Sequence, residues 1–147
     1  MIISDIISLD RTKCAVECQS KKRILEIISE IAVKQNPSLD QVDVLNSLLS
    51  REKMGSTGIG NGIAIPHGRI SGIDNVMAII VTSDSGIDFD AIDNRPVDIF
   101  FAILVPKEQA EKHLASLAAI ARKLGNKDIV KAIRSAENKN QIIAALA

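Results

Sequence analysis

The sequence predicts an α/β fold in which one sheet carries helices on both of its faces. Two strongly apolar runs, residues 76–82 and 97–105, have the length of strands, and such runs are typical of strands covered on both sides. Residues 108–124 repeat apolar side chains at helical spacing, and further helical patterns lie on either side of the two runs. Because helices and strands alternate along the chain, the layered α/β class follows.

Two helices are predicted before the first apolar run. Ser20 is suited to cap a helix that continues to about Gln35, and Asn36-Pro37 ends it because the residue before proline is pushed out of the helical region. The inward face of this helix is expected to be formed by Ile24, Ile27, Ile28 and Ile31.

The second helix is predicted to begin after Ser38, its candidate cap, and to end at Gly55. Its inward face is expected to contain Val42, Leu45, Leu48 and Leu49.

The remaining elements are shorter. Residues 62–66 predict a strand that enters a turn at Pro66-His67-Gly68. Gly125 is expected to end the 108–124 helix. Asn126 or Asp128 is expected to start a helix to about Ser135, and Asn138 or Asn140 a last one.

The only cysteines, Cys14 and Cys18, lie on one parity of an alternating stretch at residues 12–18. Their spacing is not C-x-x-C, and the two histidines do not complete a zinc pattern. Two buried thiols on the inner face of a strand are therefore expected, the alternative being a metal or redox role.

Length and composition indicate the number of domains and exclude several classes of protein. The chain has 147 residues, about one domain, so residues 1–147 are treated as one. It carries 18 Lys plus Arg, 18 Asp plus Glu and 2% aromatics, without the basic excess or stacking platform of a nucleic-acid binder. No apolar run is long enough for a membrane span, and the N-terminus lacks the basic region of a signal peptide. A cytoplasmic protein is expected.

Five of the eight glycines lie within residues 55–68. A P-loop is excluded because no lysine follows the glycines and the order is helix, loop, strand. Gly58 and Gly60 begin a dinucleotide fingerprint, but residue 63 is isoleucine. With both nucleotide motifs excluded, the glycines indicate a segment whose backbone can adopt positive φ at several positions. This segment leads directly to His67.

The absence of a side chain at Gly68 is interpreted as clearing space for a large partner to approach the His67 imidazole. The alternative is a glycine-rich turn with a merely exposed histidine. On a helical wheel the only other histidine, His113, lies among apolar residues in the second turn of the 108–124 helix. It is either a satisfied core histidine or one at the rim of the core that reaches toward the glycine loop, where the helix start would help to hold an anion.

Two imidazoles and an arginine suit phosphoryl chemistry. Histidine forms covalent intermediates, and its imidazole is available as the neutral form near pH 7. Stabilising a transferring phosphoryl group depends on positioning and positive charge. Arg51, just before the loop, is the candidate cation, although an arginine at a helix end is often only solvated.

The run GSTGIGNGIAIPHG at residues 55–68 resembles the active-site signature of the EIIA domains of the bacterial phosphotransferase system, fructose–mannitol class. Residues 18–30, 89–98 and 102–106, and His113-Leu114, extend the resemblance over nearly the whole chain. The resemblance is strongest to the nitrogen-related branch of this family.

The resemblance implies a mixed, parallel and antiparallel, sheet of about five strands. It implies a phosphotransferase component, rather than a stand-alone turnover enzyme, in which His67 accepts a phosphoryl group on Nε2 from the phosphohistidine of an HPr-like carrier (NPr). Arg51 and His113 are implied to support His67, and no metal or cofactor is implied. Contacts to the phosphoryl group or the partner are suggested for Thr57, Gly68 and Arg69.

Three functions remain open. A regulatory phosphocarrier would signal by its phosphorylation state, and the resemblance suggests targets in potassium transport and in nitrogen or carbon balance. A sugar-transport EIIA would pass the phosphoryl group to an EIIB cysteine. A binding module would use a histidine that is never phosphorylated.

Lys21, Lys22 and Arg23 open the first helix, where the helix dipole disfavours cations. They form either a solvated cluster or a contact for an acidic surface of a partner.

Overall fold

The computed structural model describes residues 3–147, and for residues 110–112 and 114 it describes the backbone alone. Six strands in this range form one sheet in the order β1-β5-β6-β3-β2, with β4 also beside β6. They are β1 (Thr12–Val16), β2 (Gly58–Gly60), β3 (Ile63–Ala64), β4 (His67–Ile70), β5 (Met77–Ile87) and β6 (Val97–Pro106).

The sheet is mixed. β6 runs antiparallel to β5 and parallel to β3 and β4, while β1 is parallel to β5. The predicted α/β class is confirmed, and the described sheet has six strands rather than about five.

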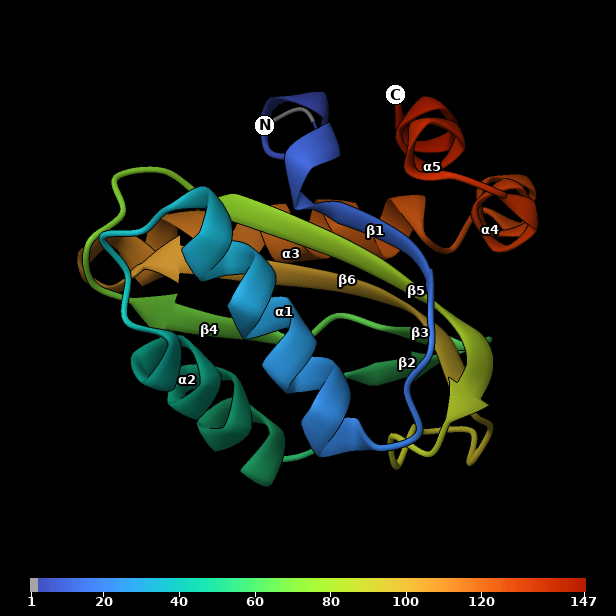
Figure 1. The fold of residues 1–147 in the computed structure, drawn as a ribbon, viewed down its shortest axis with the longest axis horizontal. Coiled ribbons are helices and arrows are strands. Elements are labelled where there is room, and N and C mark those ends of the chain that lie inside the picture. The colour runs from blue at the N-terminus through green and yellow to red at the C-terminus, as the bar shows by residue number, and fades with distance from the viewer. Residues whose placement is uncertain (1–2) are drawn as a thin grey trace.

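Helices cover both faces of the sheet (Figure 1). One face carries α1 (Lys21–Gln35) and α2 (Gln41–Lys53), and the other carries α3 (Leu114–Lys123), α4 (Lys127–Ser135) and α5 (Lys139–Leu146). Two 3-10 turns, η1 (Ile3–Asp5) and η2 (Leu9–Arg11), precede β1. Among residues 3–147, no helix has the length and apolar character needed to cross a bilayer.

Residues 99–105 of β6 are all apolar because this strand contributes to two cores. Successive side chains point to opposite faces of a strand, so each face of β6 supplies every second residue. Phe100, Ala102 and Leu104 pack in the core under α1 and α2. Ile99, Phe101 and Ile103 pack in the core under α3, α4 and α5.

α1 forms as predicted, since the Ser20 hydroxyl accepts a hydrogen bond from Arg23 N at 3.1 Å and the helix ends at Gln35. α2 differs at its start. Asp40, not Ser38, is its cap, and its carboxylate accepts from Val42 N at 2.8 Å.

The buried face of α2 was also predicted incorrectly at one position. Val44 and Leu48 are at most 1% exposed, whereas Val42 is 63% exposed. The face is centred on Val44 and Leu48, and two residues turn a helix by about 200°, so Val42 points away from the sheet.

The predicted turn at His67 is wrong. His67 is the first residue of β4 and pairs with Ile103 of β6 in a parallel register. Pro66 and Gly68 suggested a turn, but the Pro66 carbonyl accepts from Ile103 N at 2.8 Å and continues the strand pairing. The partner strand lies more than 30 residues further along the chain, so local sequence does not reveal it.

The predicted helix over residues 108–124 is divided. A 3-10 segment, η3 (Lys107–His113), follows β6 and has non-helical dihedrals at Gln109 (φ −126°, ψ 20°). α3 begins only at Leu114, so His113 is its N-cap residue and not part of a second turn. For α4 and α5 the first of the two predicted starts is the cap in each case, Asn126 rather than Asp128 and Asn138 rather than Asn140.

The two cysteines do not share a face. Ala15 has φ 55°, and the pairing of β1 with β5 shifts register between Lys13 and Val16. This irregularity breaks the strict alternation, so Cys14 packs against the core of α3–α5 while Cys18 is buried in the core of α1 and α2. The expectation of two thiols on one inner face is therefore wrong.

Replacing Phe100 by alanine is expected to lower the free energy of unfolding by about 3–5 kcal/mol, because it empties a fully buried site and removes the edge-to-face contact with Phe89. Since the chain has no Trp or Tyr, urea unfolding should be followed by far-UV circular dichroism. Val42→Ala is the control and should change stability by less than about 0.5 kcal/mol. A large loss for Val42→Ala would contradict the placement of α2.

Candidate functional site

Residues that are far apart in the sequence line one pocket of about 1120 Å³. Arg51 comes from α2, His67 and Arg69 come from β4, and His113 lies at the start of α3. Both histidines and the candidate arginine, which are far apart in the sequence, are therefore brought to one place.

Hydrogen bonding selects one tautomer of His67. Nδ1 lies 2.9 Å from the Ile65 carbonyl oxygen, which can only accept, so Nδ1 carries the proton. Nε2 is then unprotonated, and it accepts a hydrogen bond from Arg51 Nε at 3.1 Å. The lone pair of Nε2 is thus directed toward the guanidinium group in the pocket.

The pKa of His67 is lowered below its usual 6.5. Burial of the half-exposed ring is the main cause, and the charge of Arg51 adds to it, while the hydrogen bond to Ile65 and the charge of Glu52 act in the opposite direction. His67 is therefore neutral at pH 7, in the form that has a free electron pair.

Arg51 is held from two sides. Its Nη1 donates to the Gly55 carbonyl at 2.8 Å, while its Nε donates to His67. Because Gly55 lies two residues beyond the end of α2, the same side chain holds the start of the following loop and reaches the imidazole.

His113 presents a buried nitrogen without a hydrogen bond. Its Nε2 is inaccessible to solvent and has no partner among the described residues, although the side chain as a whole is half-buried and lines the pocket. Such an atom is costly to leave unpaired, so it marks a position suited to a ligand atom. The idea of a core histidine with an internal partner is not supported by this geometry.

Sequence reasoning missed Glu52. Its side chain is 4% exposed and forms an ion pair with Lys21 Nζ at 3.4 Å. Its carboxylate also accepts hydrogen bonds from the backbone N–H of Thr57, at 3.0 and 3.1 Å, and from the Thr57 hydroxyl. Glu52 therefore fixes the loop that follows α2, while its neighbour Arg51 faces the pocket. A carboxylate next to the candidate arginine was the only signal, and it was not distinctive.

The three suggested contact residues have different environments. Thr57 is buried, bonded to Glu52 and absent from the pocket lining. Arg69 is exposed and lines the pocket. Gly68 packs against Ser47 of α2, and a Cβ atom there would collide with the Ser47 hydroxyl. The absence of a side chain at Gly68 is thus required by the packing of β4 on α2. Gly68 also lines the pocket, and its interpretation as clearing space for a partner stays a prediction.

The basic cluster at the start of α1 is largely engaged within the chain. Lys21 contacts Glu52 and lies 4.5 Å from the centre of the Phe89 ring. Arg23 pairs with Glu30 at 3.0 Å and with Glu26 at 3.5 Å. Among the described residues, Lys22 is the one cation of the three that forms no ion pair with a carboxylate. The cluster is therefore not a uniform surface for a partner.

No metal site is apparent in the described part of the chain, where no three His, Cys, Asp or Glu side chains group as ligands.

Replacing Arg51 by glutamine is expected to raise the pKa of His67, because a nearby positive charge is removed. The NMR titration of the His67 ring should give a pKa below 6.5 in the wild type and a higher value in Arg51→Gln. Arg51→Lys keeps the charge and is the control, with a pKa that stays low. An unchanged or lower pKa in Arg51→Gln would contradict the arrangement.

The lowered pKa of His67 also makes the free energy of unfolding depend on pH. The unfolded chain binds this proton at a higher pH than the folded one, so the contribution of His67 is present above about pH 6.5 and is lost as the pH falls through the folded pKa.

Replacing Glu52 by alanine is expected to lower the free energy of unfolding by about 2–3 kcal/mol, because Thr57 N–H and Lys21 lose their acceptor. Urea unfolding followed by circular dichroism measures the change. Glu30→Ala, which removes the exposed partner of Arg23, is the matched control and should be nearly neutral. Equal effects of the two substitutions on the free energy of unfolding would show that Glu52 does not hold the loop after α2.

The sequence is similar to those of known proteins. Residues 5–147 match the family model of the phosphoenolpyruvate-dependent sugar phosphotransferase system, EIIA 2. The chain is 48% identical over 142 residues to the nitrogen regulatory protein of Escherichia coli K12. The aligned stretch covers 95% of this chain and 86% of that protein. It is 34% identical over 145 residues to the fructose-specific EIIA component of Haloferax volcanii, covering 99% of this chain and 94% of that protein.

The fold of the chain is also similar to that of a solved structure. The crystal structure of the nitrogen regulatory protein IIA-Ntr from Neisseria meningitidis superposes with a TM-score of 0.90 at 34% identity, over 99% of both chains. Since the family model spans almost the whole chain, this protein belongs to the EIIA 2 family of the phosphoenolpyruvate-dependent phosphotransferase system.

Proposed function

We propose that this protein is a regulatory phosphocarrier of the nitrogen-related branch of the phosphotransferase system, and that His67 accepts the phosphoryl group from an HPr-like carrier (NPr). The observation that carries the proposal is the neutral His67 ring, with its proton on Nδ1 and its Nε2 lone pair directed into the pocket beside Arg51. The similarity to nitrogen regulatory proteins supports the regulatory branch.

The hydrogen bond to Ile65 prepares His67 for attack. When Nε2 gives its electron pair to phosphorus, the ring gains positive charge, and the Nδ1 proton is already held by a carbonyl oxygen. This contact fixes the orientation of the ring and stabilises the charge that develops on it.

The transfer balances without an added proton. The bond between phosphorus and the donor nitrogen breaks and leaves its electron pair on the donor ring, while Nε2 of His67 forms the new bond. A donor ring that enters protonated on its other nitrogen leaves as neutral imidazole. His67 becomes a phosphoimidazole that keeps its Nδ1 proton.

Arg51 has to change partner during this step. Its Nε–H donates to the same lone pair that forms the new bond, so this hydrogen bond cannot survive phosphorylation. The guanidinium group, with five donors, is then suited to bind the oxygens of the phosphoryl group. Because Arg51 also holds the Gly55 carbonyl, the change affects the loop after α2.

His113 is proposed as the second donor to the phosphoryl oxygens. Its buried Nε2 lacks a partner, and it lies where α3 begins, at the positive end of a helix dipole. A phosphoryl group in the pocket would supply the missing partner and receive stabilisation in return.

Phosphorylation changes the surface that a target protein meets. A phosphate on the histidine adds negative charge, about −1.5 to −2 as on other phosphorylated side chains. Around the pocket lie apolar side chains such as Met54, which is 82% exposed. A target that docks on this rim would therefore discriminate between the two states.

The decisive experiment is phosphorylation with phosphoenolpyruvate, an Enzyme I homologue and an HPr-like carrier. The wild type should take up one acid-labile, alkali-stable phosphate, and His67→Ala should take up none. His113→Ala should slow transfer by about 100-fold, the usual cost of losing one donor to a developing charge, and remain folded. Lys34→Ala, an exposed change at the end of α1, is the control and should transfer normally.

Three outcomes would overturn parts of this proposal. Label in His67→Ala would refute the acceptor, and no label in the wild type from any cognate carrier would leave only a binding module. Loss of stability in His113→Ala, with normal transfer by the folded fraction, would make His113 a structural residue.

A sugar-transport role is the second candidate, and the similarity to the fructose-specific EIIA component of Haloferax volcanii favours it. In this role an EIIB domain would take the phosphoryl group from His67 onto its cysteine. Rapid loss of label to a supplied EIIB, compared with slow hydrolysis without it, would support transport over regulation.

A further inference from the structure

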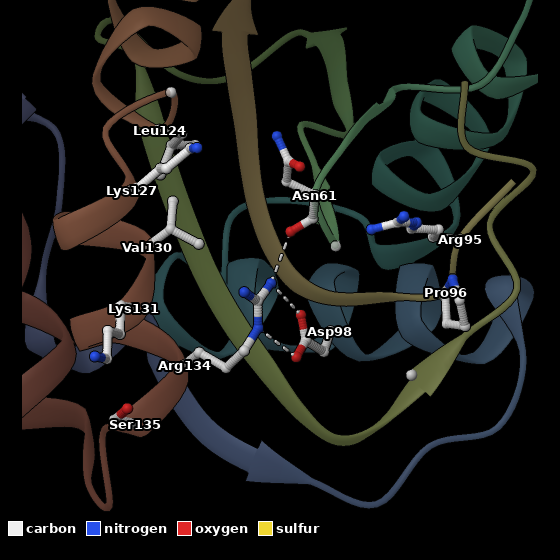
Figure 2. A pocket seen from close by; sticks show the side chains of 13 residues that line it. Asn61, Arg95, Pro96, Asp98, Leu124, Lys127, Val130, Lys131, Arg134 and Ser135 are labelled. Atoms are coloured by element: carbon white, nitrogen blue, oxygen red, sulfur yellow. Dashed lines mark hydrogen bonds and ion pairs between the residues drawn. The ribbon is translucent and has the colours of Figure 1, made fainter. Parts of the chain in front are cut away.

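A second pocket, of about 660 Å³, lies apart from the residues of the His67 pocket (Figure 2). Its lining comes from α4 and the preceding loop on one side, and from residues 61–62 and the start of β6 on the other. This volume is in the range of sites for small molecules, about 300–1,000 Å³.

Arg134 lines this pocket, and three hydrogen bonds hold its guanidinium group in place. Its Nε and Nη2 donate to the two carboxylate oxygens of Asp98, each at 2.8 Å, and Nη2 also donates to the Asn61 carbonyl at 2.8 Å (Figure 2). Nη1 has no hydrogen bond among the described residues. A guanidinium group fixed in this way keeps one donor group available to a ligand without further loss of side-chain freedom.

Gly62 allows this arrangement. It has φ 78°, and a Cβ atom there would lie 2.5 Å from Arg134 Nη2 and 2.9 Å from Asp98 Oδ1. Only glycine lets the ion pair lie directly against the backbone, so the loop and the cation are fitted to each other.

The pocket has an excess of positive charge. Four basic side chains and one carboxylate line it, and that carboxylate, Asp98, is already paired with Arg134. Lys127 forms no ion pair with any carboxylate of the described residues, and Arg95 faces it across the pocket (Figure 2). Asp93, beside Arg95, accepts hydrogen bonds from the backbone N–H of Asn61 and of Arg95 itself.

The floor of the pocket is apolar. Leu124 and Val130 are buried, at 2% and 7% exposure, and Pro96 lies opposite them. A ligand that uses both features needs an anionic group together with a carbon skeleton.

A phosphate monoester fits the cations better than a carboxylate. A carboxylate has two oxygens in one plane, whereas a phosphate monoester presents three oxygens around phosphorus. Arg95 lies just before β6, whereas Lys127 and Arg134 belong to the first and last turns of α4, so the three side chains reach the pocket from different directions (Figure 2). We infer that this pocket binds a small organic phosphate, with its phosphate among these three cations and its carbon skeleton on Leu124 and Val130.

Binding can be measured on the full chain with benzyl phosphate, inorganic phosphate and benzyl alcohol as probes, by NMR titration of the backbone amides. Benzyl phosphate should give saturable shifts centred on Gly62, Gly125 and Lys127. Inorganic phosphate should bind at the same amides but several-fold more weakly, and benzyl alcohol should not bind. The alcohol tests for the need of the anion, and phosphate tests for the contribution of the apolar floor.

The double substitution Arg95→Gln and Lys127→Gln should weaken benzyl phosphate binding by about tenfold or more, because two charge-assisted contacts are lost. Lys139→Gln, an exposed change of the same charge on α5, is the control and should alter binding by less than about twofold. Both variants leave Arg134 and Asp98 in place, and an unchanged amide spectrum away from the pocket confirms their fold.

Several results would overturn the inference. Equal weakening by Lys139→Gln would indicate a diffuse charge effect, and shifts centred on Gly68 and Arg69 would place the probe in the His67 pocket. Binding of an Asp- and Glu-rich peptide at these amides, without binding of benzyl phosphate, would make the surface a protein contact. None of these results depends on whether His67 is phosphorylated.

Discussion

The burial of β6 on both faces is the constraint on which the rest of the structure depends. This strand supplies alternate side chains to two separate cores, one under α1 and α2 and one under α3, α4 and α5. It also pairs with β5, β3 and β4, so it fixes both the helical layers and the strand that begins with His67. A strand that is buried in this way cannot slip by one residue, because a slip would exchange its two faces.

The site is built on this frame by two neighbouring residues of α2 with opposite tasks. Arg51 faces the pocket and bonds to the imidazole, while Glu52 turns inward and binds the loop through Thr57. One helix end thereby positions a cation beside His67 and holds the backbone that leads away from it. The charge of Glu52 is stabilised by Lys21, so the start of α1 is part of the same assembly.

A net charge of zero conceals a marked local separation of charge. The pocket beside α4 collects basic side chains, and Arg51 and Arg69 lie around His67. The zero balance predicts that the chain has no general nucleic-acid-binding surface, but it carries no information about individual pockets. Such clusters form only when separate segments meet, since residues 61–62, 95–98 and 124–135 are distant along the chain.

Local signals in the sequence determined the fold class, the two long strands, α1 with its Ser20 cap, the caps of α4 and α5, and the identity of His67, His113 and Arg51 as residues of interest. The tertiary structure decided that His67 lies in a strand, that His113 precedes α3 rather than lying inside an α-helix, that Gly68 packs against Ser47, and that Glu52 anchors the loop. The physical reason is the range of the interactions. Caps and hydrophobic periodicity act over a few neighbouring residues, whereas parallel strand pairing and buried ion pairs join residues that only folding brings together.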